Sequence, residues 1–201
     1  GEGVTTAVGN QVAMGVLAYK LLSLLGFVAV AWAVPKLARK LGGDPQLALW
    51  LSVANPVLIL HLVGGMHNES IMVGLVSIGL VGILQRSVGK VIGGLALIGA
   101  AVALKATAFI AVPFAVWLMM HHLAPSASST LAKKIGAFLL SGFIAVSVNV
   151  AVVAGITWLS GSSWGWISEI SGNSKVINPL AIPTLITDTV VPVAKIFAPD
   201  F

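Results

Sequence analysis

Cysteine is absent from this sequence of 201 residues, and charged residues make up only 8% of it. Without cysteine the chain has no disulfide, no thiolate metal ligand and no cysteine nucleophile. A typical soluble domain is about 25% charged because its surface faces water. Here 58% of the residues are hydrophobic and the mean hydropathy is +1.03. This composition excludes a soluble enzyme and a disordered chain, and it indicates an integral membrane protein.

Basic residues are few and are scattered in ones, twos and threes between apolar runs, although the pI is near 9.8. This spacing favours membrane topology over a nucleic-acid-binding face, so we expect no nucleic-acid partner. The sequence also lacks a phosphate-binding glycine-rich loop, HExxH and GxSxG. We predict neither a cofactor nor a metal site, since no carboxylate lies near His121 and His122 in sequence.

Apolar runs separated by polar connectors predict an all-α fold, a polytopic transmembrane helical bundle. The spans are expected at residues 10–34, 46–65, 71–84, 91–104 with 106–120 as a short hairpin, and 135–159, followed by an outward-facing tail over 161–201. Asn55-Pro56 is expected to kink the second span. The chain opens Gly1-Glu2-Gly3, without Met or a signal peptide. We therefore expect residues 1–201 to form one domain of a longer polypeptide.

The stretch 91–120 fits either one long helix or two short helices folded back at Lys105. The positive-inside rule prefers the hairpin, because it places seven basic residues on the cytoplasmic side: Lys36, Arg39, Lys40, Arg86, Lys90, Lys133 and Lys134. Of the six acidic residues, Asp44 then faces inward, and the others face outward: Glu2, Glu69, Glu169, Asp188 and Asp200. We predict an outward-facing N-terminus and tail in the plasma membrane.

Polar residues from four places are expected to meet at the outer face. They are His67-Asn68-Glu69, Lys105 at the hairpin tip, Lys20 in the first span, and the tail residues Glu169, Lys175 and Asp188. An ionisable group at membrane depth is costly and is a functional hypothesis by default. Lysine binds phosphate as a point charge, and glutamate or histidine can act as a general base. The set therefore suits an anionic lipid head and a hydroxylated substrate.

Simpler interpretations remain open for the same residues. The turn at 64–70 fits a polar loop in which Asn68 or Ser70 caps the third span, and both lysines fit anchors that reach the interface. Asn149, inside the last span, is expected to form an interhelical hydrogen bond. From the chemistry alone, a transporter or lipid flippase that uses the same outward polar site fits nearly as well as an enzyme. A scaffold subunit is the third alternative.

Residues 55–69 resemble a known signature. Asn55-Pro56, Leu58 and the run HLVGGMHNE are similar to the "NP…LxxGGxHND" pattern of the polyprenyl-phosphomannose-dependent α-(1→6)-mannosyltransferases. These are actinobacterial GT-C-type membrane enzymes that build the mannan backbone of lipomannan. The similarity covers most of the chain, through "YRLL" at Tyr19–Leu22, the basic connector at Pro35–Pro45 and "KAPA…LPF" from Lys105 to Phe114.

The resemblance implies transfer of mannose from a polyprenyl-phosphate-mannose donor to a growing α-1,6-mannan on the outer face, by an inverting single displacement. Its expected partners are membrane lipids, this donor, the mannan acceptor and a further segment of the same polypeptide. Glu69 is the candidate catalytic base, with Glu2 as the alternative; the family usually has Asp at position 69 and keeps its catalytic acid in a loop that would precede Gly1. The implied substrate-binding residues are His67, Asn68, Lys105, Lys20 and Asn55.

Overall fold

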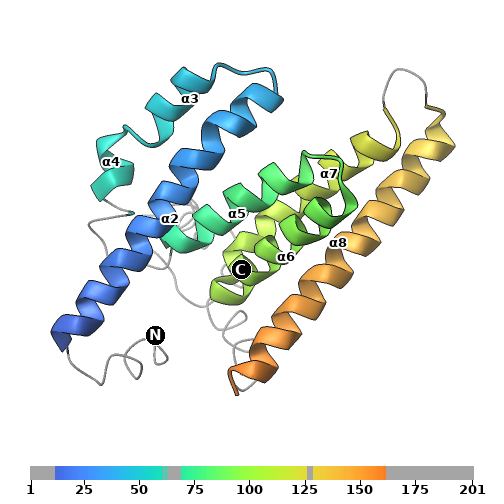
Figure 1. The fold of residues 1–201 in the computed structure, drawn as a ribbon. Coiled ribbons are helices and arrows are strands. Elements are labelled where there is room, and N and C mark those ends of the chain that lie inside the picture. Colours follow the sequence, from blue (N-terminus) through green and yellow to red (C-terminus); the bar gives the residue numbers. More distant parts are fainter. Residues whose placement is uncertain (1–11, 61, 63–68, 126–128, 162–201) are drawn as a thin grey trace, which may run out of the picture. The chain divides into compact units, whose positions relative to one another are not determined.

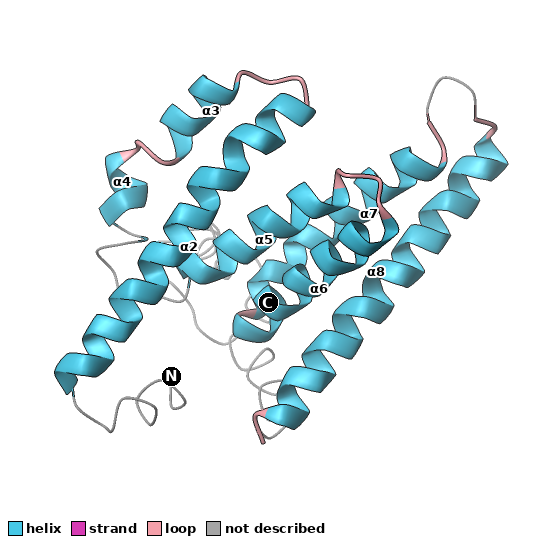
Figure 2. Cartoon of the chain, viewed as in Figure 1, coloured by secondary structure: helices cyan, strands magenta, loops and turns pink. Residues whose placement is uncertain are grey.

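A computed structural model describes residues 12–60, 62, 69–125 and 129–161. The helices in these ranges are α2 (Val12–Lys40), α3 (Pro45–Ser52), α4 (Pro56–Ile59), α5 (Glu69–Ile83), α6 (Val88–Leu104), the 3₁₀ helix η2 (Ala106–Ile110), α7 (Ala111–Leu123) and α8 (Leu131–Leu159) (Figure 1). No strand occurs within the described ranges (Figure 2). The predicted all-α class is confirmed. Glu2 and the tail that follows Gly161 both lie outside these ranges.

Helix α2 continues past residue 34, where the sequence predicted its end. Pro35 lies inside the helix, which is a position that membrane helices tolerate, and the basic connector is built from strong helix formers. The helix ends at Lys40 and is followed by Gly42, whose φ is 82°, and the Gly43 N–H donates to the Ala38 carbonyl at 2.8 Å. This left-handed cap satisfies the carbonyls at the end of the helix.

The second predicted span, 46–65, is broken rather than kinked. Helix α3 ends at Ser52 and α4 begins at Pro56. Proline has no N–H to donate and disfavours helical backbone in the residue before it. Asn55 is accordingly extended (φ −70°, ψ 119°), and its side chain accepts a hydrogen bond from the Val57 N–H at 3.0 Å. Two short helices therefore replace one kinked helix.

The chain folds back at Lys105, which is one of the two arrangements that the sequence left open. Lys105 has extended backbone (φ −157°, ψ 120°) between the end of α6 and the start of η2. Helix α7 then returns along the bundle, so that His122 shares a cavity of about 380 Å³ with Arg86 at the start of the hairpin. Which side of a membrane each end faces remains a prediction.

Helices α2 and α5 pack closely and run parallel. A Cβ added at Gly26 would lie 2.4 Å from the Ser70 carbonyl, and one added at Gly74 would lie 3.1 Å from the Ala29 side chain. The residue numbers rise together on both helices, which defines the parallel direction. Backbones approach this closely only where small residues line the contact, as is typical of helix packing in membranes.

Helix α6 packs antiparallel to α5, and α8 runs parallel to α6. A Cβ on Gly94 would lie 2.4 Å from the Gly79 carbonyl oxygen, and one on Gly99 would lie 3.0 Å from the Val152 side chain. The start of α6 shares a cavity with the first half of α8, through Val91 and Ile144. The apolar core lies between α5, α6, α7 and α8, around Ile83, Leu95, Ile98, Val112 and Ala115.

These directions give the bundle two chemically different ends. The starts of α5 and η2 lie at one end, together with the first half of α2. The ends of α2 and α5 and the starts of α6 and α8 lie at the other. That second end carries the seven basic residues Lys36, Arg39, Lys40, Arg86, Lys90, Lys133 and Lys134; we call it the basic end.

Large apolar side chains cover the outside of these helices, and several buried side chains are polar. Leu25, Phe143 and Trp158 are 65%, 72% and 81% exposed, whereas Ser70 and Ser141 are fully buried. Within the described ranges, three helices are long and apolar enough to cross a membrane: Ala13–Lys40, Ala106–Leu123 and Leu131–Leu159. This surface suits lipid rather than water. The chain is a membrane protein.

Asn149 does not form the interhelical hydrogen bond that the sequence suggested. Its Nδ2 donates to the Ala145 carbonyl of the same helix at 2.8 Å. Its Oδ1 is buried without a hydrogen-bond partner among the described residues. A carbonyl one turn earlier is always within reach of such a side chain, and the neighbouring residue on α6 is Gly99, which has no side chain to offer. The interhelical prediction was wrong.

Candidate functional site

Glu69 and Lys105 meet at the end of the bundle opposite the basic end. Glu69 is the first residue of α5, and Lys105 is the extended residue after α6. Because these two helices run antiparallel, the start of one lies beside the end of the other. The Lys105 Nζ donates to Glu69 Oε1 in an ion pair between residues 36 positions apart. The structure thus joins two of the predicted site residues.

The ion pair is accessible from outside the bundle. The Lys105 side chain is 45% exposed and that of Glu69 is 26% exposed. An ion pair with this exposure contributes about 0–1 kcal/mol to stability. An incoming anion can therefore replace the carboxylate at Lys105 at little cost to the fold.

A buried hydrogen bond fixes the position of Glu69. Ser70, the next residue, is fully buried, and its Oγ donates to the Ser23 carbonyl of α2 at 2.5 Å. The close contact at Gly26 lies one turn further along α2. Ser70 therefore ties the start of α5 to α2 rather than capping its own helix. Ser23 is not among the residues predicted from the sequence; its spacing from Gly26, a small residue one turn away, is the pattern that could have indicated the contact.

A second contact holds the hairpin tip against α5. The Thr107 Oγ1 donates to the Met72 Sδ at 3.6 Å. Thr107 follows Lys105 by two residues, and Met72 lies one turn after Glu69. Although sulfur is a weak acceptor, this contact joins the same two segments as the ion pair. The carboxylate and the ammonium are thus held by two elements that contact each other in two places.

Lys20 lies at the same end of the bundle as the ion pair. It precedes Ser23 by one helical turn on α2, and Ser23 contacts the start of α5. Its side chain is exposed. The contacts of the described residues do not connect it to Glu69 or Lys105.

Of the remaining predicted site residues, Asn55 lies within the described ranges, and His67 and Asn68 do not. Asn55 is exposed, and its side chain caps α4, so its described role is local. Within the described ranges, no three His, Asp or Glu side chains gather as candidate metal ligands.

The geometry combines two chemical functions at one place. A carboxylate can accept a proton from a hydroxyl group, and an ammonium can stabilise a phosphate or another developing anion. Because they lie side by side at one end of the bundle, both groups can reach substrates bound at that end. This combination suits transfer of a group away from a phosphate to a hydroxyl.

Comparison with known proteins gives a consistent match. Residues 1–121 match the family model described as "Alpha-(1->6)-mannopyranosyltransferase, N-terminal domain". The whole chain is 51% identical over 208 residues to alpha-(1->6)-mannopyranosyltransferase A of Corynebacterium glutamicum, covering 42% of that protein. It is 40% identical to alpha-(1->6)-mannopyranosyltransferase A of Mycobacterium tuberculosis over 181 residues, which is 90% of this chain and 34% of that protein.

A further relative has a lower identity to the chain. Alpha-(1->6)-mannopyranosyltransferase B of Corynebacterium glutamicum is 31% identical over 194 residues, which is 90% of this chain and 31% of that protein. The chain thus spans less than half the length of these curated relatives. No solved structure matches it significantly.

Proposed function

Because the chain belongs to the alpha-(1->6)-mannopyranosyltransferase family, we propose that it takes part in mannosyl transfer and that Glu69 and Lys105 lie at the reacting centre. The donor in this proposal is a polyprenyl-phosphate mannose, and the acceptor is a growing α-1,6-mannan of the lipomannan type. The observation that carries the proposal is the ion pair between two residues of the family-like motifs. These residues are far apart in sequence and are held by separate elements.

The proposed reaction is a single displacement at C1 of the mannose. The acceptor hydroxyl oxygen forms a bond to C1 as the bond from C1 to the phosphate oxygen breaks, and the β-linked sugar becomes α-linked. The hydroxyl proton passes to the Glu69 carboxylate. The leaving group is polyprenyl phosphate, and Lys105 stabilises its charge.

Binding of the donor would rearrange the ion pair. The donor phosphate takes the place of Glu69 beside the Lys105 ammonium, which frees the carboxylate to face the acceptor. Because the pair is partly exposed, this exchange needs little desolvation. Lys20 at the same end, and His67 and Asn68, which precede Glu69 in the sequence, are the further residues proposed to bind the two substrates.

The proposed location of this reaction is the outer face of the plasma membrane. The seven basic residues gather at the opposite end of the bundle, and basic residues collect on the cytoplasmic side. The end with Glu69 and Lys105 then faces outward, where a mannan chain is extended.

Glu69→Gln and Lys105→Met test the proposal in membranes from cells that produce the protein. Supplied with radiolabelled polyprenyl-phosphate mannose, each variant is expected to lose about 100-fold or more in mannosyl transfer. Lys133→Met is the matched control, because it removes an exposed lysine at the basic end. We expect this control to transfer mannose at the normal rate.

Protein abundance in the membrane must be equal for all three variants. Normal transfer by both Glu69→Gln and Lys105→Met would contradict the proposed site. Uptake of a substrate into proteoliposomes without sugar transfer would contradict the proposed reaction.

A further inference from the structure

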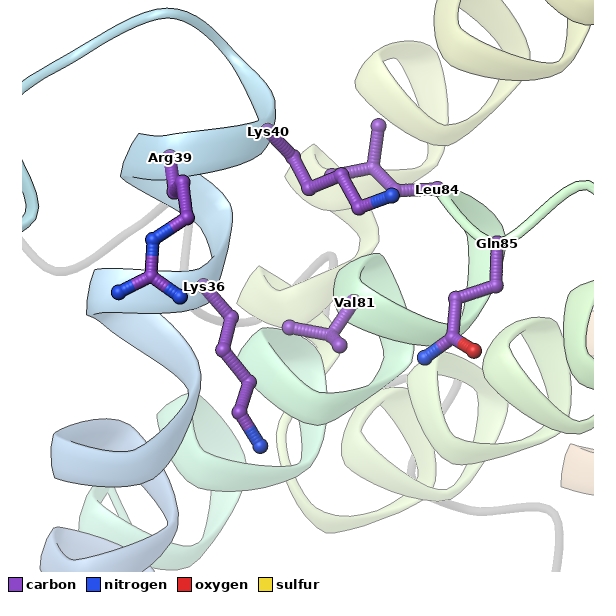
Figure 3. A pocket seen from close by; sticks show the side chains of 6 residues that line it. All are labelled: Lys36, Arg39, Lys40, Val81, Leu84 and Gln85. Atoms are coloured by element: carbon purple, nitrogen blue, oxygen red, sulfur yellow. The ribbon is translucent and has the colours of Figure 1, made fainter.

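A cavity of about 150 Å³ lies between α2 and α5 at the basic end (Figure 3). Its lining residues are Lys36, Arg39, Lys40, Val81, Leu84 and Gln85. In the figure, the Lys40 side chain extends from α2 toward Leu84 at the end of α5. Three basic residues thus border a hollow whose remaining wall is mostly apolar. The ammonium of one of them, Lys36, lies over the Trp32 ring, 3.3 Å from its centroid. This site is separate from the Glu69–Lys105 site, which lies at the other end of both helices.

The amide of Gln85 adds a hydrogen-bond donor to this cavity. Lys90 Nζ donates to Gln85 Oε1 at 2.5 Å. Because an ammonium group can only donate, the oxygen of the amide must face Lys90. The amide nitrogen then faces the other way, and in Figure 3 it lies on the side of Val81. Each polar side chain that lines the cavity therefore carries a donor, and the acceptor of Gln85 is already bonded to Lys90.

The acceptors at the end of α2 and at Asp44 already have other partners. The Leu41 N–H donates to the Leu37 carbonyl at 2.9 Å, and the Gly43 N–H donates to that of Ala38 at 2.8 Å. The carbonyls at the end of α2 therefore do not need the basic side chains as caps. Asp44 accepts from the Gln46 N–H at 2.7 Å and caps α3. No acidic residue is among those that line the cavity.

We propose that this cavity binds a phosphate group, and that in the membrane the phosphate belongs to the headgroup of an anionic phospholipid. Lys36, Arg39 and Lys40 supply the charge, and Gln85 supplies a neutral donor. Basic pockets between membrane helices on the cytoplasmic side are suited to such headgroups. Val81 and Leu84 give an acyl chain an apolar surface beside the phosphate. A free phosphate ion is also an anion, but it has no acyl chain to contact that surface.

Native mass spectrometry of the detergent-purified protein tests this proposal with phosphatidylglycerol, phosphatidylcholine and inorganic phosphate as separate probes. We expect adducts of phosphatidylglycerol at concentrations where phosphatidylcholine gives few, and no displacement by an equal concentration of inorganic phosphate. The double variant Arg39→Gln/Lys40→Gln should bind phosphatidylglycerol about 30-fold more weakly, or about fivefold for each cation. Gln85→Glu should also weaken binding, because it places an anion beside the phosphate.

The matched control is Lys133→Gln/Lys134→Gln, which removes two cations from the same end but outside this cavity. We expect less than about a twofold change in this control. Equal losses in the two double variants would overturn the proposal, since they would indicate a diffuse basic surface. Normal binding by Arg39→Gln/Lys40→Gln would overturn it as well. Displacement of the lipid by an equal concentration of inorganic phosphate would overturn the lipid as the source of the phosphate.

Discussion

The proposed function depends on the ion pair between Glu69 and Lys105. The sequence predicted that both lie at the outer face, because an ionisable group in an apolar stretch needs an explanation and folding back at Lys105 places the two on the same side. It could not show that they contact each other, since that contact depends on the antiparallel packing of α5 and α6. A residue that acts through its backbone was harder to predict: Ser23 contributes a carbonyl, so only its small side chain and its spacing from Gly26 could have indicated the contact.

Exchanging the two charges separates the structural role of the ion pair from its chemical role. Glu69→Lys combined with Lys105→Glu keeps an opposite-charge pair between α5 and the hairpin tip. We expect the unfolding free energy to stay within about 1 kcal/mol of the wild-type value. Mannosyl transfer should still fall about 100-fold or more, because each group now lies on the wrong side of the substrate. Thermal unfolding in detergent and radiolabel transfer measure the two effects.

Transfer by this double variant at the rate of the wild-type protein would contradict the assigned roles. Such a result would show that only the pairing of the two charges is required. The single variants Glu69→Gln and Lys105→Met then serve as the comparison, since each removes one of the two charges.

Ser70 and Ser141 offer a matched pair of buried hydroxyl groups. Both are fully buried, but Ser70 donates to Ser23, whereas the Ser141 Oγ has no hydrogen-bond partner among the described residues. Ser70→Ala should cost about 1 kcal/mol, and Ser141→Ala should be neutral or stabilising. Only Ser70→Ala should also slow mannosyl transfer, because Ser70 positions Glu69. Equal effects of the two substitutions on stability and transfer would contradict this difference.

At the scale of helices, proline has two different outcomes in this chain. Pro35 lies inside α2, whereas Pro56 begins α4 after a break. The residues before each proline account for the difference. Val34 has no side-chain hydrogen bond to offer, but Asn55 can cap a new helix. The sequence predicted a span that ends at residue 34 and a kink at Asn55-Pro56. In the structure α2 continues to Lys40, and the chain is broken between α3 and α4.

The crossing of α2 and α5 depends on Gly26. An added Cβ there would lie 2.4 Å from Ser70 backbone atoms, whereas one on Gly142 of α8 would meet nothing within 4 Å. Gly26→Ala should therefore cost about 1–3 kcal/mol, and Gly142→Ala should stabilise by about 0.5–1 kcal/mol. Thermal unfolding of both variants in the same detergent compares them directly. Unchanged stability of Gly26→Ala would show that the two helices are not in close contact.

At the scale of the molecule, the bundle separates its charges by end. Cations gather where α2 and α5 finish, and the Glu69–Lys105 pair lies where α5 and η2 begin. Charge counting along the sequence favoured this separation once the chain was folded back at Lys105. The close helix contacts could not be read in the same way, because glycine is common in this chain and only some glycines lie against a neighbouring helix. The phosphate-binding cavity proposed at the basic end likewise depends on packing.

Cysteine accessibility in intact cells tests the central claim most directly. The chain contains no cysteine, so Lys105→Cys and Lys133→Cys each introduce a single thiol at an exposed position at opposite ends of the bundle. A membrane-impermeant maleimide is predicted to label position 105 in intact cells and position 133 only after the membrane is permeabilised. Labelling of both positions from outside, or of position 133 alone, would contradict an outward-facing site at Glu69 and Lys105.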